Sequence, residues 1–170
     1  MAMMHRGSLI IRAIEMIRIA TMMAGFYWIY DRQALGLEVE ALRFLVLTLA
    51  LSLCGTCALE GVFFSESSAR EKGYRVEGER KSPYQVQNLA WFLAATATGV
   101  WLFEVESQDP AALLGYAVFV LLFFGLSALN HGYQAIRFGN LTWQNVNRPV
   151  LFGVLIVAAV PVIAPFLLKS

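Results

Sequence analysis

Four long apolar segments constrain the fold of this chain more than any other feature. The first is uncharged from Phe44 to Leu59, and a charged residue stands at each end of that run. Inside a bilayer every backbone amide needs a partner within the chain, so a segment of roughly 20 apolar residues predicts a membrane-spanning helix. We therefore expect an all-α integral membrane bundle of four transmembrane helices. The expected helices cover residues 39–64, 83–103, 110–129 and 149–168.

The composition agrees with a membrane protein. Of the 170 residues, 58% are hydrophobic, whereas soluble domains contain about 45–50%. Charged residues make up only 15% of the chain, and most of them lie between the apolar segments. The net charge of +1 does not favour a nucleic-acid partner, and the sequence predicts no cleaved signal peptide. We expect membrane lipids and other membrane protein subunits as partners.

Two of the predicted helices open on strong start signals. Ser82-Pro83-Tyr84-Gln85 combines a capping serine, a proline at the first helical position and a glutamine three residues after the cap. Asp109-Pro110 repeats the cap and the proline before the third helix. In the fourth helix Pro161 and Pro165 each lack a backbone donor, so we expect a kink there.

The segment Ser8–Tyr30 predicts a helix of a different kind, with polar residues on about one third of its circumference. Its uncharged run, Ile19–Tyr30, is shorter than the roughly 20 residues that a crossing needs. We first expect an amphipathic helix lying in the membrane interface, with a short fifth span as the alternative. Residues 1–38 then form this helix and a linker, and residues 39–170 form the four-helix transmembrane domain. The polar residues are Ser8, Arg12, Glu15 and Arg18.

The charges between the apolar segments predict the orientation of the chain. Loop 65–81 is rich in Lys and Arg and loop 130–148 also carries arginines, whereas the turn 104–109 has neither residue type. Positive residues are enriched in cytoplasmic loops, so we expect loops 65–81 and 130–148 at the cytoplasmic face of a cell (inner) membrane. Arg12 and Arg18 then lie on the wrong side, unless the N-terminal helix also crosses.

Cys54 and Cys57 form the one motif with a chemical name, a C-x-x-C sequence within a predicted helix. Such a pair can exchange disulfides when one thiol is activated. Here both cysteines lie deep in an apolar helix, where thiols are inert. A small-residue face for close helix packing around Gly55 is therefore the preferred interpretation, and a redox pair is the alternative.

Polar residues near the ends of the spans are the other candidates for a functional site. Glu60 is an acid at the edge of a span, which makes it a candidate for proton or quinone handling. A snorkelling Glu60 paired with Arg70 is the simpler interpretation. Gln85, Gln87 and Asn88 could bind a head group or a quinone carbonyl, although hydrogen bonds to neighbouring helices explain them more simply.

The supply of histidine limits the cofactors that this chain can hold. It contains two histidines, and haem, di-iron and zinc sites need more ligands than that. His131, near a helix end, is interpreted as a partner for backbone carbonyls or the adjacent loop. We expect no metal, no catalytic residue and no cofactor, with a bound lipid or quinone as the one ligand to look for.

Short motifs on both sides of the second apolar segment are shared with a known family. They include Ala69-Arg70-Glu71, Gly73-Tyr74 and Ser82-Pro83-Tyr84-Gln85, and later His131 with Gly139-Asn140 and Asn145. In these motifs residues 40–165 resemble small uncharacterised DoxX-like polytopic membrane proteins. The resemblance implies a compact helical bundle in a bacterial or archaeal cell membrane. Gln87 stands where a glutamate is expected, and no residue carries over the quinone-linked sulfur oxidation associated with DoxX itself.

Three functions follow from these observations. We expect a non-catalytic accessory or structural subunit of a larger membrane complex, in a prokaryotic energy-converting membrane. A quinone- or thiol-linked membrane redox protein that uses Cys54, Cys57 and Glu60 is the alternative. A small-solute carrier with a hinge at Pro161 and Pro165 is ranked last, because the predicted spans contain no paired charges.

Overall fold

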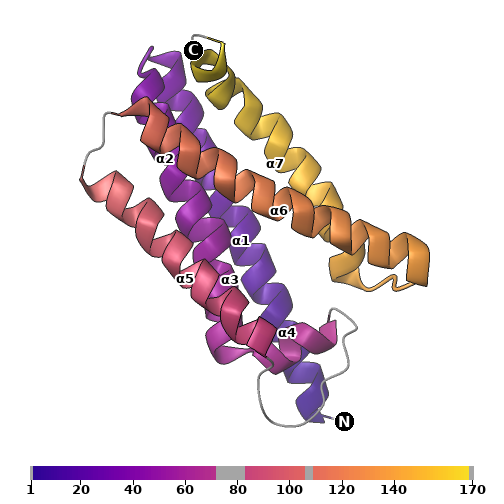
Figure 1. Ribbon diagram of the computed structural model, residues 1–170. Coiled ribbons are helices and arrows are strands. Elements are labelled where there is room, and N and C mark those ends of the chain that lie inside the picture. Colours follow the sequence, from indigo (N-terminus) through magenta and orange to yellow (C-terminus); the bar gives the residue numbers. More distant parts are fainter. Residues whose placement is uncertain (1, 72–82, 106–108, 169–170) are drawn as a thin grey trace.

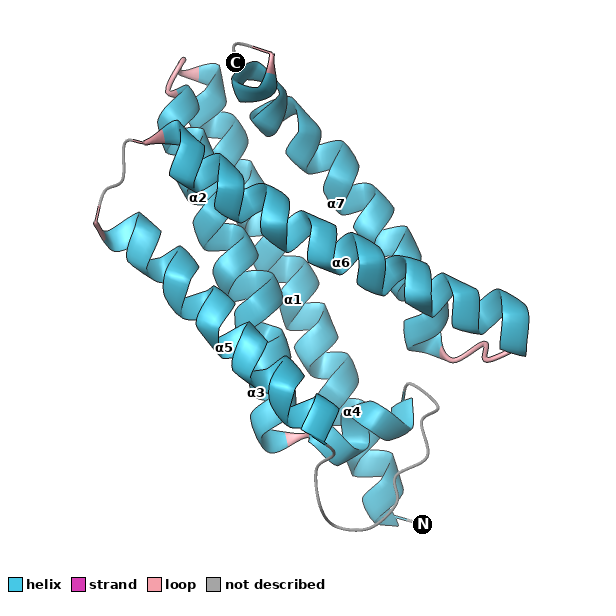
Figure 2. Cartoon of the chain, viewed as in Figure 1, coloured by secondary structure: helices cyan, strands magenta, loops and turns pink. Residues whose placement is uncertain are grey.

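The computed structural model describes residues 2–71, 83–105 and 109–168, and every regular element in these ranges is a helix (Figure 1, Figure 2). Most of the helices run lengthwise in a single bundle. The N-terminus lies at the same end of the bundle as α4, and the C-terminus lies at the opposite end. In chain order the elements are α1 (Ala2–Ala34), α2 (Glu38–Thr48), the π-helical segment η1 (Leu49–Gly55), α3 (Thr56–Phe63), α4 (Ser65–Glu71), α5 (Pro83–Glu104), α6 (Pro110–Phe138) and α7 (Trp143–Leu167).

Four helices are long and apolar enough to cross a membrane, which confirms the predicted all-α architecture. The first of them joins α2, η1 and α3 into one continuous helix, Glu38–Phe63. The other three are Gln85–Glu104, Pro110–Phe138 and Trp143–Leu167. The first two match their expected ranges to within two residues, whereas the third continues to Phe138 instead of residue 129 and the last begins at Trp143 instead of residue 149.

The helix Glu38–Phe63 is the centre of the bundle. In its most apolar window 67% of the residues are buried, against 17% for α5 and 22% for α7. Leu42, Leu45 and Leu49 are fully buried in it and form the middle of the hydrophobic core. Since α5, α6 and α7 leave most of their residues partly or fully exposed, they present apolar side chains to the lipid.

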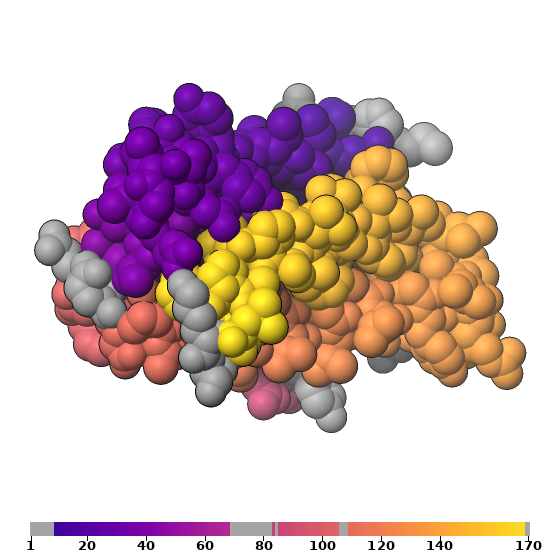
Figure 3. All heavy atoms as spheres, turned by 90° about the horizontal axis from the view of Figure 1, so that it is seen from above, coloured from indigo at the N-terminus to yellow at the C-terminus, as the bar shows by residue number. Residues whose placement is uncertain are grey.

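The N-terminal helix α1 is a full-length member of this bundle. It runs antiparallel to Glu38–Phe63, because Arg18 contacts Glu60 near one end and Arg32 lies 3.9 Å from Glu40 near the other. Three hydrogen bonds join α1 to α7, and each links residues 128 positions apart, so these two helices run parallel. Seen along the bundle, α7 lies between the N-terminal helices and α6 (Figure 3).

In this arrangement α1 packs along the bundle as a fifth long helix, although it is not one of the four helices that are apolar enough to cross a membrane, so whether it crosses stays a prediction. An interfacial helix would lie across the end of the bundle, whereas α1 follows α7 along its length. With 33 residues, α1 is also longer than expected. At 1.5 Å per residue it extends about 50 Å, enough for a bilayer core of about 30 Å.

Two of the polar residues of α1, Glu15 and Arg18, point into the bundle while Arg12 is exposed, which differs from an interfacial helix whose polar residues all face water. Glu15 and Arg18 are only 4% and 7% exposed, while Met16 and Ile17 on the apolar face are 66% and 56% exposed. The periodicity therefore placed Glu15 and Arg18 correctly on one face of the helix. That face is buried in the bundle and not exposed to water. In lipid the apolar side of a helix faces out, and buried polar groups face their partners.

The last helix begins earlier in the chain than the sequence predicts. We expected it to begin at Pro149 after a polar loop covering residues 139–148, but α7 begins at Trp143 and Pro149 lies inside it. The loop is short because α6 continues to Phe138 and ends on Gly139, whose φ of 62° is left-handed.

Asp109 caps α6 as expected, since its side chain accepts a hydrogen bond from the Ala111 amide. The predicted cap of α5, Ser82, lies outside the described residues.

One of the prolines in α7 is compensated by α1. Pro165 has no N–H, so the carbonyl of Pro161 loses its partner within the helix. The side-chain amide of Gln33 donates to that carbonyl at 2.9 Å. A neighbouring bond, from the Tyr30 hydroxyl to the Ala158 carbonyl at 2.8 Å, also joins α1 to this end of α7. A proline in a membrane helix is tolerated when another helix supplies the missing donor.

Replacing Gly99 by alanine tests the packing of α5 against the central helix. A β-carbon at Gly99 would lie 2.5 Å from the β-carbon of Ala50 and 2.6 Å from the Tyr116 hydroxyl. We expect Gly99→Ala to lower the free energy of unfolding by about 1–3 kcal/mol. A lower melting temperature in detergent would show this loss. Gly115→Ala is the control because its new methyl meets nothing within 4 Å. It should be neutral or stabilising; equal losses for both variants would contradict this packing.

Candidate functional site

Five ionisable side chains from four helices meet inside the bundle, and we call them the buried charge cluster. Glu15 and Arg18 come from α1, Glu60 from α3, His131 from α6 and Arg148 from α7. The first four are at least nine-tenths buried. An intramembrane charge is expensive unless paired, so such residues mark candidate sites. The cluster lies toward the end of the bundle that carries α4 and the N-terminus.

An ion pair between Arg18 and Glu60 is the strongest contact of the cluster. Arg18 Nη2 donates to Glu60 Oε1 at 2.6 Å, and Arg18 Nε donates to Thr56 Oγ1 at 2.7 Å. Ser68 Oγ in α4 donates to the other oxygen of Glu60 at 3.2 Å. Glu60 is therefore buried and hydrogen-bonded, which corrects the interpretation of a snorkelling side chain. The side chain of its expected partner, Arg70, lies outside the described residues.

This ion pair also corrects the expectation that the spans lack paired charges. The two residues are 42 positions apart and belong to different helices. Arg18 was assigned to an interfacial helix, so it was not considered as a partner for Glu60. Sequence reasoning thus identified Glu60 but missed Arg18, and the only available signal was the shared polar face of Glu15 and Arg18 on α1.

His131 connects α6 to the start of α7. The side-chain amide of Asn145 donates to the Asn140 carbonyl at 2.9 Å, so its oxygen faces His131 Nδ1 at 2.6 Å. An amide oxygen only accepts, hence Nδ1 carries the proton. The other ring nitrogen, Nε2, then accepts from Arg148 Nη1 at 3.3 Å. His131 is therefore buried and contacts Asn145 and Arg148, both in the segment that the sequence assigned to the adjacent loop.

Arg148 and Glu15 are the two members of the cluster whose hydrogen bonding is incomplete. Arg148 Nη2 lies 3.9 Å from Glu60 Oε2, which is an ion-pair distance but too long for a hydrogen bond. Glu15 Oε2 accepts from the Trp143 indole at 2.9 Å. Within the described part of the chain Glu15 Oε1 and Arg148 Nε and Nη2 are buried without a hydrogen-bond partner. Buried polar atoms in this state call for an explanation, and a bound ligand or water molecule would satisfy them.

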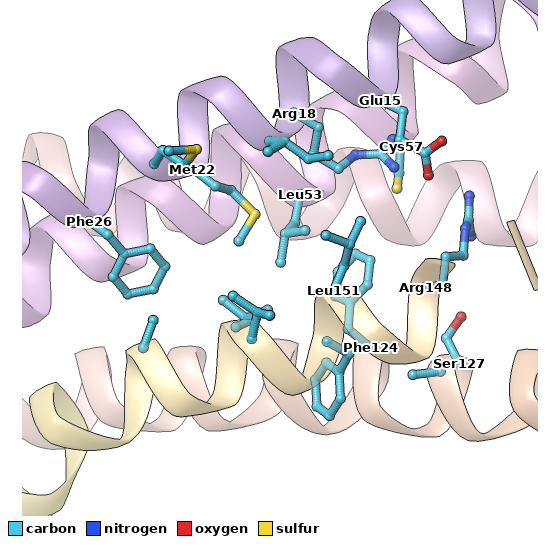
Figure 4. Close-up of a pocket in the computed structure, with 17 residues that line it drawn as sticks. Glu15, Arg18, Met22, Phe26, Leu53, Cys57, Phe124, Ser127, Arg148 and Leu151 are labelled. Carbon is cyan, nitrogen blue, oxygen red and sulfur yellow. The ribbon is translucent and has the colours of Figure 1, made fainter. Parts of the chain in front are cut away.

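An apolar cavity of about 350 Å³ leads away from these two residues (Figure 4). Glu15, Arg18 and Arg148 gather at one end of it, whereas Met22 and Phe26 lie further along α1. The volume falls within the range of small-molecule sites, about 300–1,000 Å³. The remaining lining is apolar apart from Ser127 and Cys57, and it includes Ile19, Leu53, Phe124, Ala128, Leu151, Phe152, Leu155 and Ala158.

A second, polar cavity of about 250 Å³ adjoins the first. Two of the sequence candidates, Gln85 and Asn88, line it together with Glu60 and His131. Gln87 does not line it and is exposed on α5. The two cavities share four residues, Cys57, Phe124, Ser127 and Arg148. Arg148 therefore stands between the polar cavity and the apolar one.

Cys54 and Cys57 are both buried and carry free thiols. They occupy different surroundings, because Cys57 lines both cavities while Cys54 belongs to the hydrophobic core. The expectation of a redox-active pair stays a prediction. Among the described residues no group of three or more His, Cys, Asp or Glu side chains is placed to hold a metal ion.

Comparison of the chain with protein-family models, with curated proteins and with solved structures finds no match. The resemblance to DoxX-like proteins therefore stays a prediction.

Replacing Arg18 by methionine tests the ion pair. Removing one partner leaves Glu60 buried without its main counter-charge, so we expect Arg18→Met to cost about 3–5 kcal/mol of stability. The double variant Arg18→Met, Glu60→Met removes both charges and should recover part of this loss. Thermal unfolding in detergent measures both effects. Arg12→Met, at an exposed position of the same helix, is the control. If the double variant loses as much stability as Arg18→Met and Glu60→Met lose when added together, the two residues do not pair.

Proposed function

We propose that this protein is a membrane-embedded binding protein for a single-tailed amphiphile. The tail occupies the apolar cavity between α1, α6 and α7, and the polar head meets Glu15 and Arg148. One observation carries the proposal: the cavity is apolar along its length and ends on two buried charged residues with unused hydrogen-bonding atoms. A pocket with a mainly apolar lining and a few convergent polar groups is the usual form of a small-molecule site.

The order of residues along the helices supports a lipid-like shape. On α1 the lining passes from Glu15 to Met22 and Phe26, and on α7 it passes from Arg148 to Leu155. Because α1 and α7 run parallel, both helices go from charged to apolar in the same direction. An amphiphile whose head lies near the membrane surface has its polarity arranged in this sense.

The cavity also has an opening from which such a molecule could enter. Met23 on α1 and Val154 on α7 line it and are 70% and 62% exposed. Both are apolar and both lie on helices of the outer layer, so this mouth faces the surface that lipid covers. Lateral entry from the bilayer lets the tail move between lipid and cavity without crossing water.

The orientation of the chain places the head-group end in the cytoplasm of a cell (inner) membrane, in this proposal. If α1 crosses, Arg12 lies toward the same end of the bundle as Arg137 in the last turn of α6. That arrangement removes the conflict noted in the sequence and follows the enrichment of positive residues at the cytoplasmic face.

The expected role as an accessory subunit of a larger complex stays a prediction that is compatible with ligand binding. A quinone-linked redox function is the second candidate, and one observation favours it: Cys57 lines both cavities beside the proposed head-group end. An isoprenoid quinone is an amphiphile of the required shape. Extraction in mild detergent followed by a native gel separates a subunit from a free protein.

Filling the cavity tests the proposed function. Ala158→Phe places a large ring among the lining residues, whereas Val157→Phe places the same ring at an exposed neighbouring position, 75% exposed. We expect Ala158→Phe to reduce binding of monoacylglycerol about tenfold or more, by occupying the space of the tail. Native mass spectrometry of the detergent-solubilised protein measures the bound fraction. Equal binding by both variants, with unchanged melting temperatures, would remove the proposal.

A further inference from the structure

We infer that the site selects an amphiphile whose head is uncharged and both donates and accepts a hydrogen bond, such as an alcohol or a glycerol. This inference rests on the proposed function and names the chemistry of the head. The hydroxyl group would lie between Glu15 on α1 and Arg148 on α7. The Glu15 carboxylate and the Arg148 guanidinium face the same end of the cavity from these two helices (Figure 4).

The unused atoms on the two sides of this gap are of opposite kinds. Glu15 Oε1 can only accept a hydrogen bond, and Arg148 Nε and Nη2 can only donate. A hydroxyl group satisfies both sides, because its proton goes to Glu15 and its lone pairs accept from Arg148. An ester or quinone carbonyl serves only Arg148, and an ammonium group serves only Glu15.

Glu15 is held in place for this role. It is 4% exposed, and its other oxygen is fixed by the Trp143 indole at 2.9 Å. Arg148 is held in turn by His131 at 3.3 Å and by Glu60 at 3.9 Å. These contacts hold both groups at the end of the cavity, so the site is prepared for a head that matches them.

The charges of the cluster favour an uncharged head. Among the described side chains two carboxylates, Glu15 and Glu60, face two guanidiniums, Arg18 and Arg148, and the neutral form of His131 accepts from Arg148. A neutral head leaves this balance intact. An anionic head would gain a contact with Arg148 but would stand beside the Glu15 carboxylate in a buried site, where like charges repel strongly.

A series of dodecyl amphiphiles with the same tail tests the inference. The series contains dodecanol, methyl dodecanoate, dodecanoate and dodecylammonium, and competition with monoacylglycerol in native mass spectrometry ranks their affinities. We expect dodecanol to bind about tenfold tighter than the ester, since a site built to bond a hydroxyl rejects an analogue that lacks it. Dodecanoate should bind more weakly than dodecanol.

Glu15→Gln is the diagnostic variant, with Glu40→Gln as the matched control. A glutamine amide can donate, so the ester should gain affinity, and the lost negative charge should help dodecanoate most. Glu40 is partly exposed in its ion pair with Arg32, outside the cavity lining, so Glu40→Gln should rank the series as the native protein does.

The outcomes separate the two proposals. Dodecanoate as the tightest ligand of the native protein, equal affinity across the series, or an unchanged ranking in Glu15→Gln would overturn the inference about the head while leaving tail binding in place. Failure of every dodecyl compound to compete, together with no effect of Ala158→Phe, would remove the proposed function itself.

Discussion

The buried ion pair between Arg18 and Glu60 is the contact on which the rest of this structure depends. It joins α1 to the central helix at a level where neither charge can reach water, and Thr56 and Ser68 complete its hydrogen bonds. Without it, α1 would carry two charged residues into lipid, an unfavourable position for either of them. The pair therefore decides which face of α1 points inward. Once that face is fixed, Glu15 is brought to the end of the apolar cavity.

The same constraint explains why the cluster is only partly satisfied. Arg18 and Glu60 are hydrogen-bonded to each other and to Thr56 and Ser68, whereas Glu15 and Arg148 retain buried atoms without partners in the described residues. A structural network tends to use all its donors and acceptors, since an unpaired buried group lowers stability. Unused atoms on both sides of one gap, next to an apolar cavity, are better explained by a ligand than by packing. Within one cluster, Arg18 and Glu60 thus hold the helices together, whereas Glu15 and Arg148 are the pair proposed to bind a ligand.

The behaviour of α1 shows how a correct sequence pattern can yield a wrong environment. Periodicity places Glu15 and Arg18 on one face whatever surrounds the helix. In water such a face is solvated, but in a bundle surrounded by lipid it is buried among other helices, and the apolar residues Met16 and Ile17 become the exposed ones. Arg148 likewise lies in α7 and not in the predicted loop, because Pro149 is tolerated within the early turns of this helix.

The sequence by itself determined the four long apolar helices, most of their ends, the cap at Asp109 and the polar character of Glu60 and His131, but it assigned α4 to a loop. These properties are local, since they depend on hydrophobic length, capping and residue type over one or two turns. Only the tertiary structure decided which polar groups meet, because Arg18 and Glu60 are 42 residues apart and Glu15 and Trp143 are 128 apart. Such pairings depend on how whole helices dock, and local periodicity carries no information about that. The cavity has the same origin, since no single helix encloses it.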